Sequence, residues 1–268
     1  MQPGHSSIFK EGCSLKYQIM KRSVNSLTGF TIGATDGEIG KVKEFYFNDN
    51  TWTIQYVIAE TGNWLSGRKV LISSEAMLRP EWEAKIFPVN LTMEQVKNSP
   101  EIDTDKPVSR QQEMELDKYY PRTGFWGGGV LNSGIGISGM VMPGNKTIEQ
   151  AIQNKEDNNP HLRSTNKVTG YKIKASDGEI GEVEDFIIDD RTLDIKFLVI
   201  DTGNWFPGKK VIISPKWIKE IKWDSSEVIV NASVEQVKYS PEYDAAQYIS
   251  DEYEANLQNY YGRFISHK

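Results

Sequence analysis

The sequence repeats itself once, at a fixed interval of 141 residues. About 33 of the 74 pairs formed by residues 28–101 and 169–242 are identical, without any gap. A solenoid buries its core by stacking many repeats, so two copies indicate a duplicated domain instead. The most similar stretches are DGEIGKV at Asp36–Val42 with DGEIGEV at Asp177–Val183, and TGNWLSGRKVLIS at Thr61–Ser73 with TGNWFPGKKVIIS at Thr202–Ser214.

The duplication divides the 268 residues into two domains of ordinary size. We predict an N-terminal extension over residues 1–25, a first repeat with a helical tail over 26–121, a glycine-rich linker with a short polar helix over 122–166, and a second repeat with a helical tail over 167–268. Within the linker, residues 134–139 match G-x-G-x-x-G. A dinucleotide site needs a strand before this motif and a helix after it, and Pro143 stops any helix, so we interpret the segment as linker.

Charge and cysteine content exclude several classes of protein. The net charge of −6 and the pI near 5.3 oppose broad binding of nucleic acid. Cys13 is the only cysteine and the three histidines lie far apart, so we predict no disulfide, no metal site, no cofactor and no catalytic residue. No signal peptide and no apolar run of ~20 residues is present. We therefore expect a cytoplasmic protein without a transmembrane segment.

Each repeat has the pattern of a mainly β domain. Asp36-Gly37 is a strong hairpin signal, Ile39–Phe47 forms an extended run, and Asn48–Thr51 supplies the next turn. Alternating apolar residues follow in TWTIQYVIAE, and the short runs KVLIS and KIFPVN complete the repeat. About six short strands in roughly 75 residues suit a small barrel, because closure removes exposed edges.

Helices are predicted after the strands. Thr92 with Gln95, and Ser233 with Gln236, fit the capping box, and each helix should stop before the proline that follows. The tails QQEMELDKYYP and AAQYISDEYEANLQNYY also have helical character. In the second tail, one stripe of the predicted helix holds part of the set Tyr248, Tyr253, Leu257 and Tyr260–Tyr261.

In these motifs the chain resembles the PRC-barrel domain family. The resemblance is carried by DGEIGKVKEFYFND and YVIAETGNWLSGRKVLIS with their second copies, and it is closest to free-standing bacterial tandem members. It implies two small β-barrels in tandem that act as a non-catalytic protein-binding or scaffold module, with an unidentified protein partner. One alternative is a peripheral component of a membrane or photosynthetic electron-transfer assembly, as for the reaction-centre H subunit. A second is a ribosome- or RNA-linked maturation factor, as for RimM.

The glycines of the DGEIG motif allow two interpretations. Backbone N–H groups in such a turn can bind an anion, but acidic neighbours oppose this. The structural interpretation is that Gly37 and Gly178 take a positive φ, while Gly40 and Gly181 allow close backbone approach. We predict structural turns at Asp36, Gly37, Gly40 and Gly67, and at Asp177, Gly178, Gly181 and Gly208.

The TGNW loops are the candidate contact surface. A tryptophan followed by two basic residues can stack on a partner and pair with its acidic groups. The alternative is that the tryptophan covers the barrel mouth while the basic pair is solvated. The candidate residues are Trp64, Arg68, Lys69, Trp205, Lys209 and Lys210. Because the surface occurs twice, it also allows a homo-oligomer.

Overall fold

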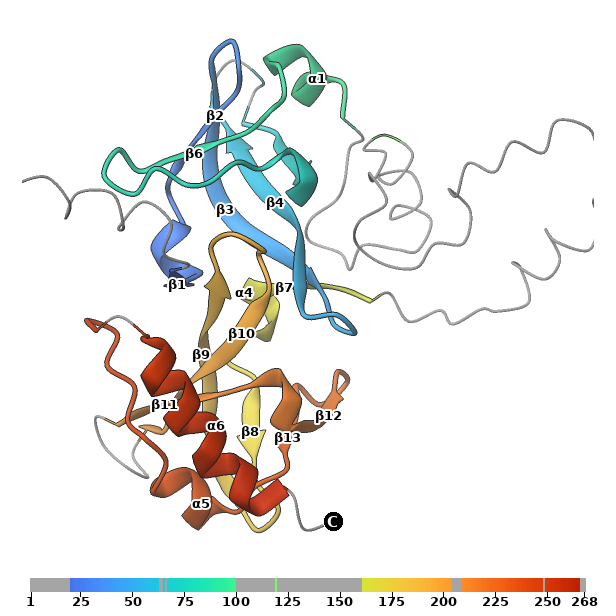
Figure 1. Ribbon diagram of the computed structural model, residues 1–268. Helices are drawn as coiled ribbons and strands as arrows, with labels where there is room; N and C mark the ends of the chain where they lie inside the picture. The colour runs from blue at the N-terminus through green and yellow to red at the C-terminus, as the bar shows by residue number, and fades with distance from the viewer. Residues whose placement is uncertain are drawn as a thin grey trace, which may run out of the picture. The chain divides into compact units, whose positions relative to one another are not determined.

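The computed structural model describes residues 20–62, 65, 67–99, 119, 161–203, 209–247 and 249–265. The chain divides into two compact units (Figure 1). We call Leu27–Thr169 the first unit, and the residues up to Ser26 together with Gly170–Lys268 the second unit. Most of the first helical tail, the polar helix expected at 147–158 and the motif at 134–139 lie outside the described residues.

The first unit is built on a long antiparallel hairpin of β3 (Glu38–Asn48) and β4 (Thr53–Thr61). Its turn has Trp52 at a φ of 56°. Among the described strands the hydrogen-bonded order is β5-β4-β3-β2-β6, and β6 runs parallel to β2. The remaining strands are β2 (Thr31–Gly33), β5 (Lys69–Ser73) and β6 (Ile86–Pro88).

The second unit repeats this arrangement and adds a strand. Its order among the described strands is β11-β10-β9-β8-β13-β12, with β13 parallel to β8. The added strand is β12, which pairs with β13; in the first unit the described counterparts are two isolated bridges. The strands are β8 (Lys172–Lys174), β9 (Glu179–Asp189), β10 (Ile195–Asp201), β11 (Lys210–Ile213), β12 (Ile218–Lys222) and β13 (Glu227–Val230). The mainly β architecture in two tandem copies is confirmed.

The central hairpins are buried on both faces. In β4 the successive residues Val57, Ile58 and Ala59 are all fully buried, although their side chains point to alternate sides of the sheet. The simple alternation expected along this strand therefore holds only for its first half. Burial on both sides shows that each hairpin runs through the interior of its unit.

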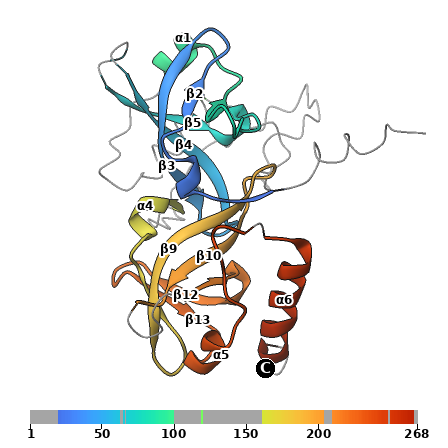
Figure 2. The ribbon, with the colours of Figure 1, turned by 90° about the vertical axis from the view of Figure 1, so that its left-hand side faces the viewer.

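Two capped helices follow the sheets as predicted. Helices α1 (Met93–Lys97) and α5 (Val234–Lys238) both carry the full capping box, and both end before the following proline. Helix α6 (Asp251–Ile265) is the predicted helical tail, and it lies beside the sheet of the second unit in both views (Figures 1 and 2). Tyr261 packs from this helix on Trp217 with 4.2 Å between the ring centroids.

A short strand precedes each repeat. The first is β1 (Lys21–Ser23), which pairs antiparallel with β9 in the second unit. The second is β7 (Leu162–Ser164), which pairs antiparallel with β3 in the first unit and runs into α4 (Thr165–Val168). We call β1 and β7 the leading strands. The sequence placed residues 162–166 in the linker and gave no sign of either strand.

Candidate interaction site

The tips of the two TGNW loops lie outside the described residues. Trp64, Trp205 and Gly208 are therefore not placed, and their role as a contact surface stays a prediction. Gly67, on the first loop, has the positive φ expected of a turn, at 69°. Its N–H group donates a hydrogen bond of 3.2 Å to the carbonyl of Gly62, which closes the loop.

Arg68 and Lys209, the first basic residue of each pair, bind the end of the following helix. The Arg68 guanidinium donates to the carbonyls of Lys97 at 3.2 Å and Ser99 at 2.8 Å. Lys209 Nζ does the same to Lys238 at 2.6 Å and Ser240 at 2.9 Å. A cation at the C-terminus of a helix satisfies carbonyls that have no partner within the helix and complements the helix dipole.

The DG motifs hold the opposite end of the same helices. Asp36 Oδ1 accepts a hydrogen bond of 2.8 Å from the N–H group of Met93, and Asp177 Oδ1 accepts one of 2.8 Å from Val234. The first turn of each helix therefore receives an extra acceptor beside its own capping box. This role of the aspartates, 57 residues away along the chain, was not predicted.

The glycines of the motifs serve close approach. A Cβ atom on Gly40 would lie 2.1 Å from the carbonyl oxygen of Glu60, and one on Gly181 would lie 2.0 Å from that of Asp201, which confirms the predicted close approach of backbones. The positive φ expected at Gly37 is wrong, and so is that at Gly178: the described glycines with φ in the left-handed region do not include them. A Cβ atom on Gly37 would lie 2.6 Å from Met93 Sδ, so the flexible Met93 side chain would have to shift.

Lys69 and Lys210, the second basic residue of each pair, begin β5 and β11. Both are partly exposed. Lys210 forms an ion pair and hydrogen bond with Glu184 Oε1. The other carboxylate oxygen of Glu184 is buried and has no hydrogen-bond partner within the part of the chain that the structure describes.

A depression of about 500 Å³ lies beside Lys210 in the second unit. The segment between α5 and α6 forms most of it, and the N–H group of Tyr243 donates a 2.8 Å hydrogen bond to the Lys210 carbonyl. The Tyr253 hydroxyl donates to the carbonyl of Glu242 at 3.1 Å, and burial raises the pKa of Tyr253 to about 12. The lining residues are Lys210, Glu242, Tyr243, Asp244, Ala245, Gln247, Ile249 and Tyr253.

This depression combines aromatic rings with both signs of charge. Such a composition suits contact with a protein segment, because the rings supply area at low entropic cost and the charged rim supplies orientation. Of its residues, sequence reasoning singled out Lys210 and placed Tyr253 on a helical stripe. It missed Glu242 and Tyr243, which precede the helix and carry no periodic signal.

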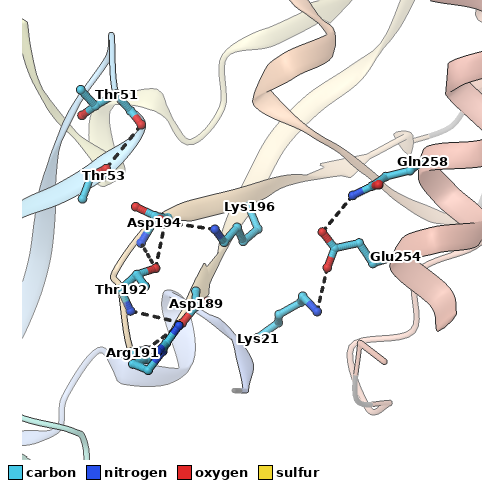
Figure 3. A network of polar contacts seen from close by, with 10 residues as sticks. All are labelled: Lys21, Thr51, Thr53, Asp189, Arg191, Thr192, Asp194, Lys196, Glu254 and Gln258. Atoms are coloured by element: carbon cyan, nitrogen blue, oxygen red, sulfur yellow. Dashed lines mark hydrogen bonds and ion pairs between the residues drawn. The ribbon is translucent and has the colours of Figure 1, made fainter. Parts of the chain in front are cut away.

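Polar side chains in the turns of the two central hairpins have structural partners. Asp49 accepts hydrogen bonds from Arg163 Nε at 2.9 Å and lies 2.9 Å from His161 Nδ1. In the second unit, Asp189 Oδ1 accepts from the N–H groups of Arg191 and Thr192 in the β9–β10 turn (Figure 3). Within the described ranges, no group of three or more His, Cys, Asp or Glu residues has the arrangement of a metal site.

Comparison with known proteins decides the family. The model of the PRC-barrel domain matches residues 21–90 and again residues 163–237. The chain belongs to the PRC-barrel domain family. A search of curated proteins found no match to it.

The two matches fix the limits of each PRC-barrel domain along the sequence. The first begins at Lys21 and includes all of β1, and the second begins at Arg163 and includes the last two residues of β7. The compact units instead assign β1 to the unit that holds the second repeat, and β7 to the unit that holds the first. None of the described helices is long and apolar enough to cross a membrane.

Proposed function

We propose that this tandem PRC-barrel protein is a non-catalytic module that binds another protein, with the depression beside Lys210 as a contact surface. The observation that carries the proposal is the chemistry of that depression, where Tyr243, Ile249 and Tyr253 lie among charged groups. The proposal extends the expected TGNW surface to the segment that packs at the start of β11.

The charges favour one kind of partner segment. Glu242 and Asp244 line the depression, and Lys210 already pairs with Glu184. The carboxylates therefore outnumber the cations available to a ligand. A segment that carries a basic side chain next to an apolar one complements this surface.

The hydrogen bonds of Arg68 and Lys209 also favour the depression beside Lys210 as the contact surface. Both cations are directed to helix carbonyls, so a partner that recruited them would have to replace those bonds. Lys69 and Lys210 lie one position further on, at the start of β5 and β11, and both are partly exposed. Only Lys210 lines the depression.

Affinity purification of the tagged full-length chain from its native cell, followed by mass spectrometry, tests the proposal. The variants are Glu242→Lys with Asp244→Lys, which reverse the charge of the depression. Glu38→Lys with Glu83→Lys is the matched control, which reverses two exposed carboxylates of the first unit. We expect one or more proteins to be recovered with wild type and the control and lost with Glu242→Lys/Asp244→Lys.

Three results would overturn the proposal: equal recovery with all variants, no recovery with wild type, or turnover of a small substrate that a single carboxylate substitution abolishes. Recovery of ribosomal proteins or of an electron-transfer complex would replace the general module with one of those two functions. The proposal includes a cytoplasmic location, and fractionation of the same cells tests it.

A further inference from the structure

Each leading strand pairs with the body of the other repeat, in the same register. Ser164 of β7 lies opposite Tyr46 of β3, and Ser23 of β1 lies opposite Ile187 of β9. Both members of the second pair are 141 residues from their counterparts in the first. The family matches begin at Lys21 and Arg163, so all of β1 and two of the three residues of β7 are matched with the repeat that follows them. On that definition the two repeats have exchanged equivalent strands.

The exchanged strand fills an edge that each hairpin leaves open. On β3, residues 38–41 pair with β2, and residues 46–48 pair with β7. Between them, the N–H group of Phe45 donates to Thr165 Oγ1 at 3.3 Å, and its carbonyl accepts from the same hydroxyl at 3.2 Å. Phe45 is fully buried, and leaving such backbone groups without partners would destabilise the hairpin.

A hydroxyl–carboxylate bond fastens each strand at an equivalent position. The Ser164 hydroxyl donates to the Glu44 carboxylate, and the Ser23 hydroxyl donates to Asp185. Asp185 also accepts a hydrogen bond of 3.1 Å from the N–H group of Asn25, two residues after the end of β1. Equivalent serine–carboxylate hydrogen bonds in both units indicate that the strand exchange is a feature of the repeat itself.

The two leading strands differ in their first residue, and each first residue fits the unit in which its strand is paired. Leu162 belongs to a buried cluster of the first unit, and the residues that share it are Tyr46, Tyr56, Ile58 and Leu71. At the equivalent position Lys21 extends a buried side chain to α6, where its Nζ lies 2.8 Å from Glu254 (Figure 3). The same Nζ lies 3.1 Å from Asp251. A lysine at position 162 would bury an unpaired charge in the apolar cluster of the first unit. The two leading strands are therefore not interchangeable.

We propose that the leading strands are mutual binding segments, by which the two repeats of one chain hold each other without help from the linker. The partner recognised by each segment is a second copy of the same fold, and the recognised surface is the free half of the β3 or β9 edge. Separating the repeats then requires that two strands be withdrawn. The proposal stands apart from the proposed function, since it concerns contacts within the chain.

Cleavage of the linker tests the proposal. A protease site is introduced at Gly128 in the full-length protein, which is cut after purification. We expect the fragments that end and begin near this position to co-elute in gel filtration at the volume of the uncut chain, and to separate only in denaturant. Separate elution in native buffer would overturn the proposal.

Cysteine cross-linking identifies which repeat each strand joins. In a Cys13→Ser background, Ser23→Cys is combined with Ile187→Cys. The neighbouring position is hydrogen-bonded, with the N–H group of Val24 donating to the Phe186 carbonyl, so the Ser23–Ile187 pair belongs to the closer, non-hydrogen-bonded type. That spacing suits a disulfide.

The matched control places the second cysteine within the same repeat. Ser23→Cys with Tyr46→Cys joins the positions that would face each other if β1 paired with its own repeat. After linker cleavage we expect the Ser23–Ile187 disulfide to keep the two fragments in one band on a non-reducing gel, and the control pair to form no disulfide. A disulfide in the control, or a cross-linked dimer of uncut chains, would show that exchange within the chain is wrong.

Discussion

Asp36 Oδ1 accepts a 2.8 Å hydrogen bond from the backbone N–H group of Met93, across 57 residues of sequence. Arg68 binds the carbonyl at the other end of the same helix, so two loop residues hold α1 from both ends. Asp177 and Lys209 repeat the arrangement on α5. The most similar motifs of the two repeats therefore serve to fix a helix of only five residues, which would be marginal alone.

Removing the aspartate should destabilise each unit by a similar amount. Asp36→Ala and Asp177→Ala each lose an acceptor at a helix N-terminus, and we expect a loss of about 1 kcal/mol in the free energy of unfolding. Urea unfolding followed by circular dichroism measures it. An exposed carboxylate nearby, Glu38→Gln, serves as control and should change the midpoint little. Equal midpoints for all four proteins would contradict the helix-holding role.

Alanine at Gly40 should be far more damaging than alanine at Gly62. The Cβ of Gly40→Ala would lie 2.1 Å from a backbone carbonyl of the neighbouring strand, whereas the Cβ of Gly62→Ala meets nothing within 4 Å. Moving a backbone within a packed hairpin costs about 1–3 kcal/mol or more. Thermal unfolding of the two variants checks the difference. Equal melting temperatures would show that the β3–β4 hairpin relaxes freely.

Truncating Leu162 should destabilise the first unit even though this residue precedes the second repeat. Leu162 is 5% exposed within the cluster that contains Tyr46 and Leu71, and a buried Leu→Ala change costs about 2–5 kcal/mol. Hydrogen exchange measured by mass spectrometry should show faster exchange in β3 and β4 for Leu162→Ala. If β9 and β10 responded instead, the assignment of β7 to the first unit would be wrong.

Asp185 should make stability depend on pH. Burial raises the pKa of its carboxyl above the ordinary 3.8, against the opposing hydrogen bonds from Ser23 and the backbone. The folded protein then retains a proton that the unfolded chain releases, so stability is lost as pH rises from about 3.8 through the folded pKa. Asp185→Asn keeps acceptor and donor groups but does not titrate.

The measurement is the difference in unfolding free energy between wild type and Asp185→Asn at a series of pH values. Wild type should lose stability relative to the variant as pH rises through that window, and the difference should level off above it. A difference that is constant, or that grows in favour of wild type, would contradict the direction of the shift. Because Asp185 holds Ser23, the same series reports on the attachment of β1.

Local signals account for what the sequence could predict. The strands around Ile39–Phe47 and the capping boxes at Thr92 and Ser233 follow from residues within a few positions of one another, and they are confirmed. Strand content and the two tandem copies are confirmed for the same reason. The duplication supported each predicted strand and helix a second time, because each pattern occurs in both repeats.

Contacts over long distances were beyond the sequence. The leading strands are three residues long, KRS and LRS, too short to show alternation, and their partners lie more than 100 residues away. The role of Arg68 was equally hidden, because a basic residue after a loop is typical of an exposed surface as well as of a helix-end contact. The hydrophobic pattern of the sequence predicts which strands and helices form. Which of the two similar edges, β3 or β9, a leading strand pairs with depends on side chains such as Leu162 and Lys21.

The position of β7 in the chain has a consequence for protein synthesis. When translation has reached residue 121, all of the first repeat has been made, yet the strand that pairs with residues 46–48 has not. About 40 more residues must be synthesised before β7 is complete, which takes some seconds at cellular elongation rates. During that time residues 46–48 of β3 have no strand to pair with on this edge. The order in which the ribosome delivers the strands therefore delays completion of the N-terminal half until the C-terminal half has begun to emerge.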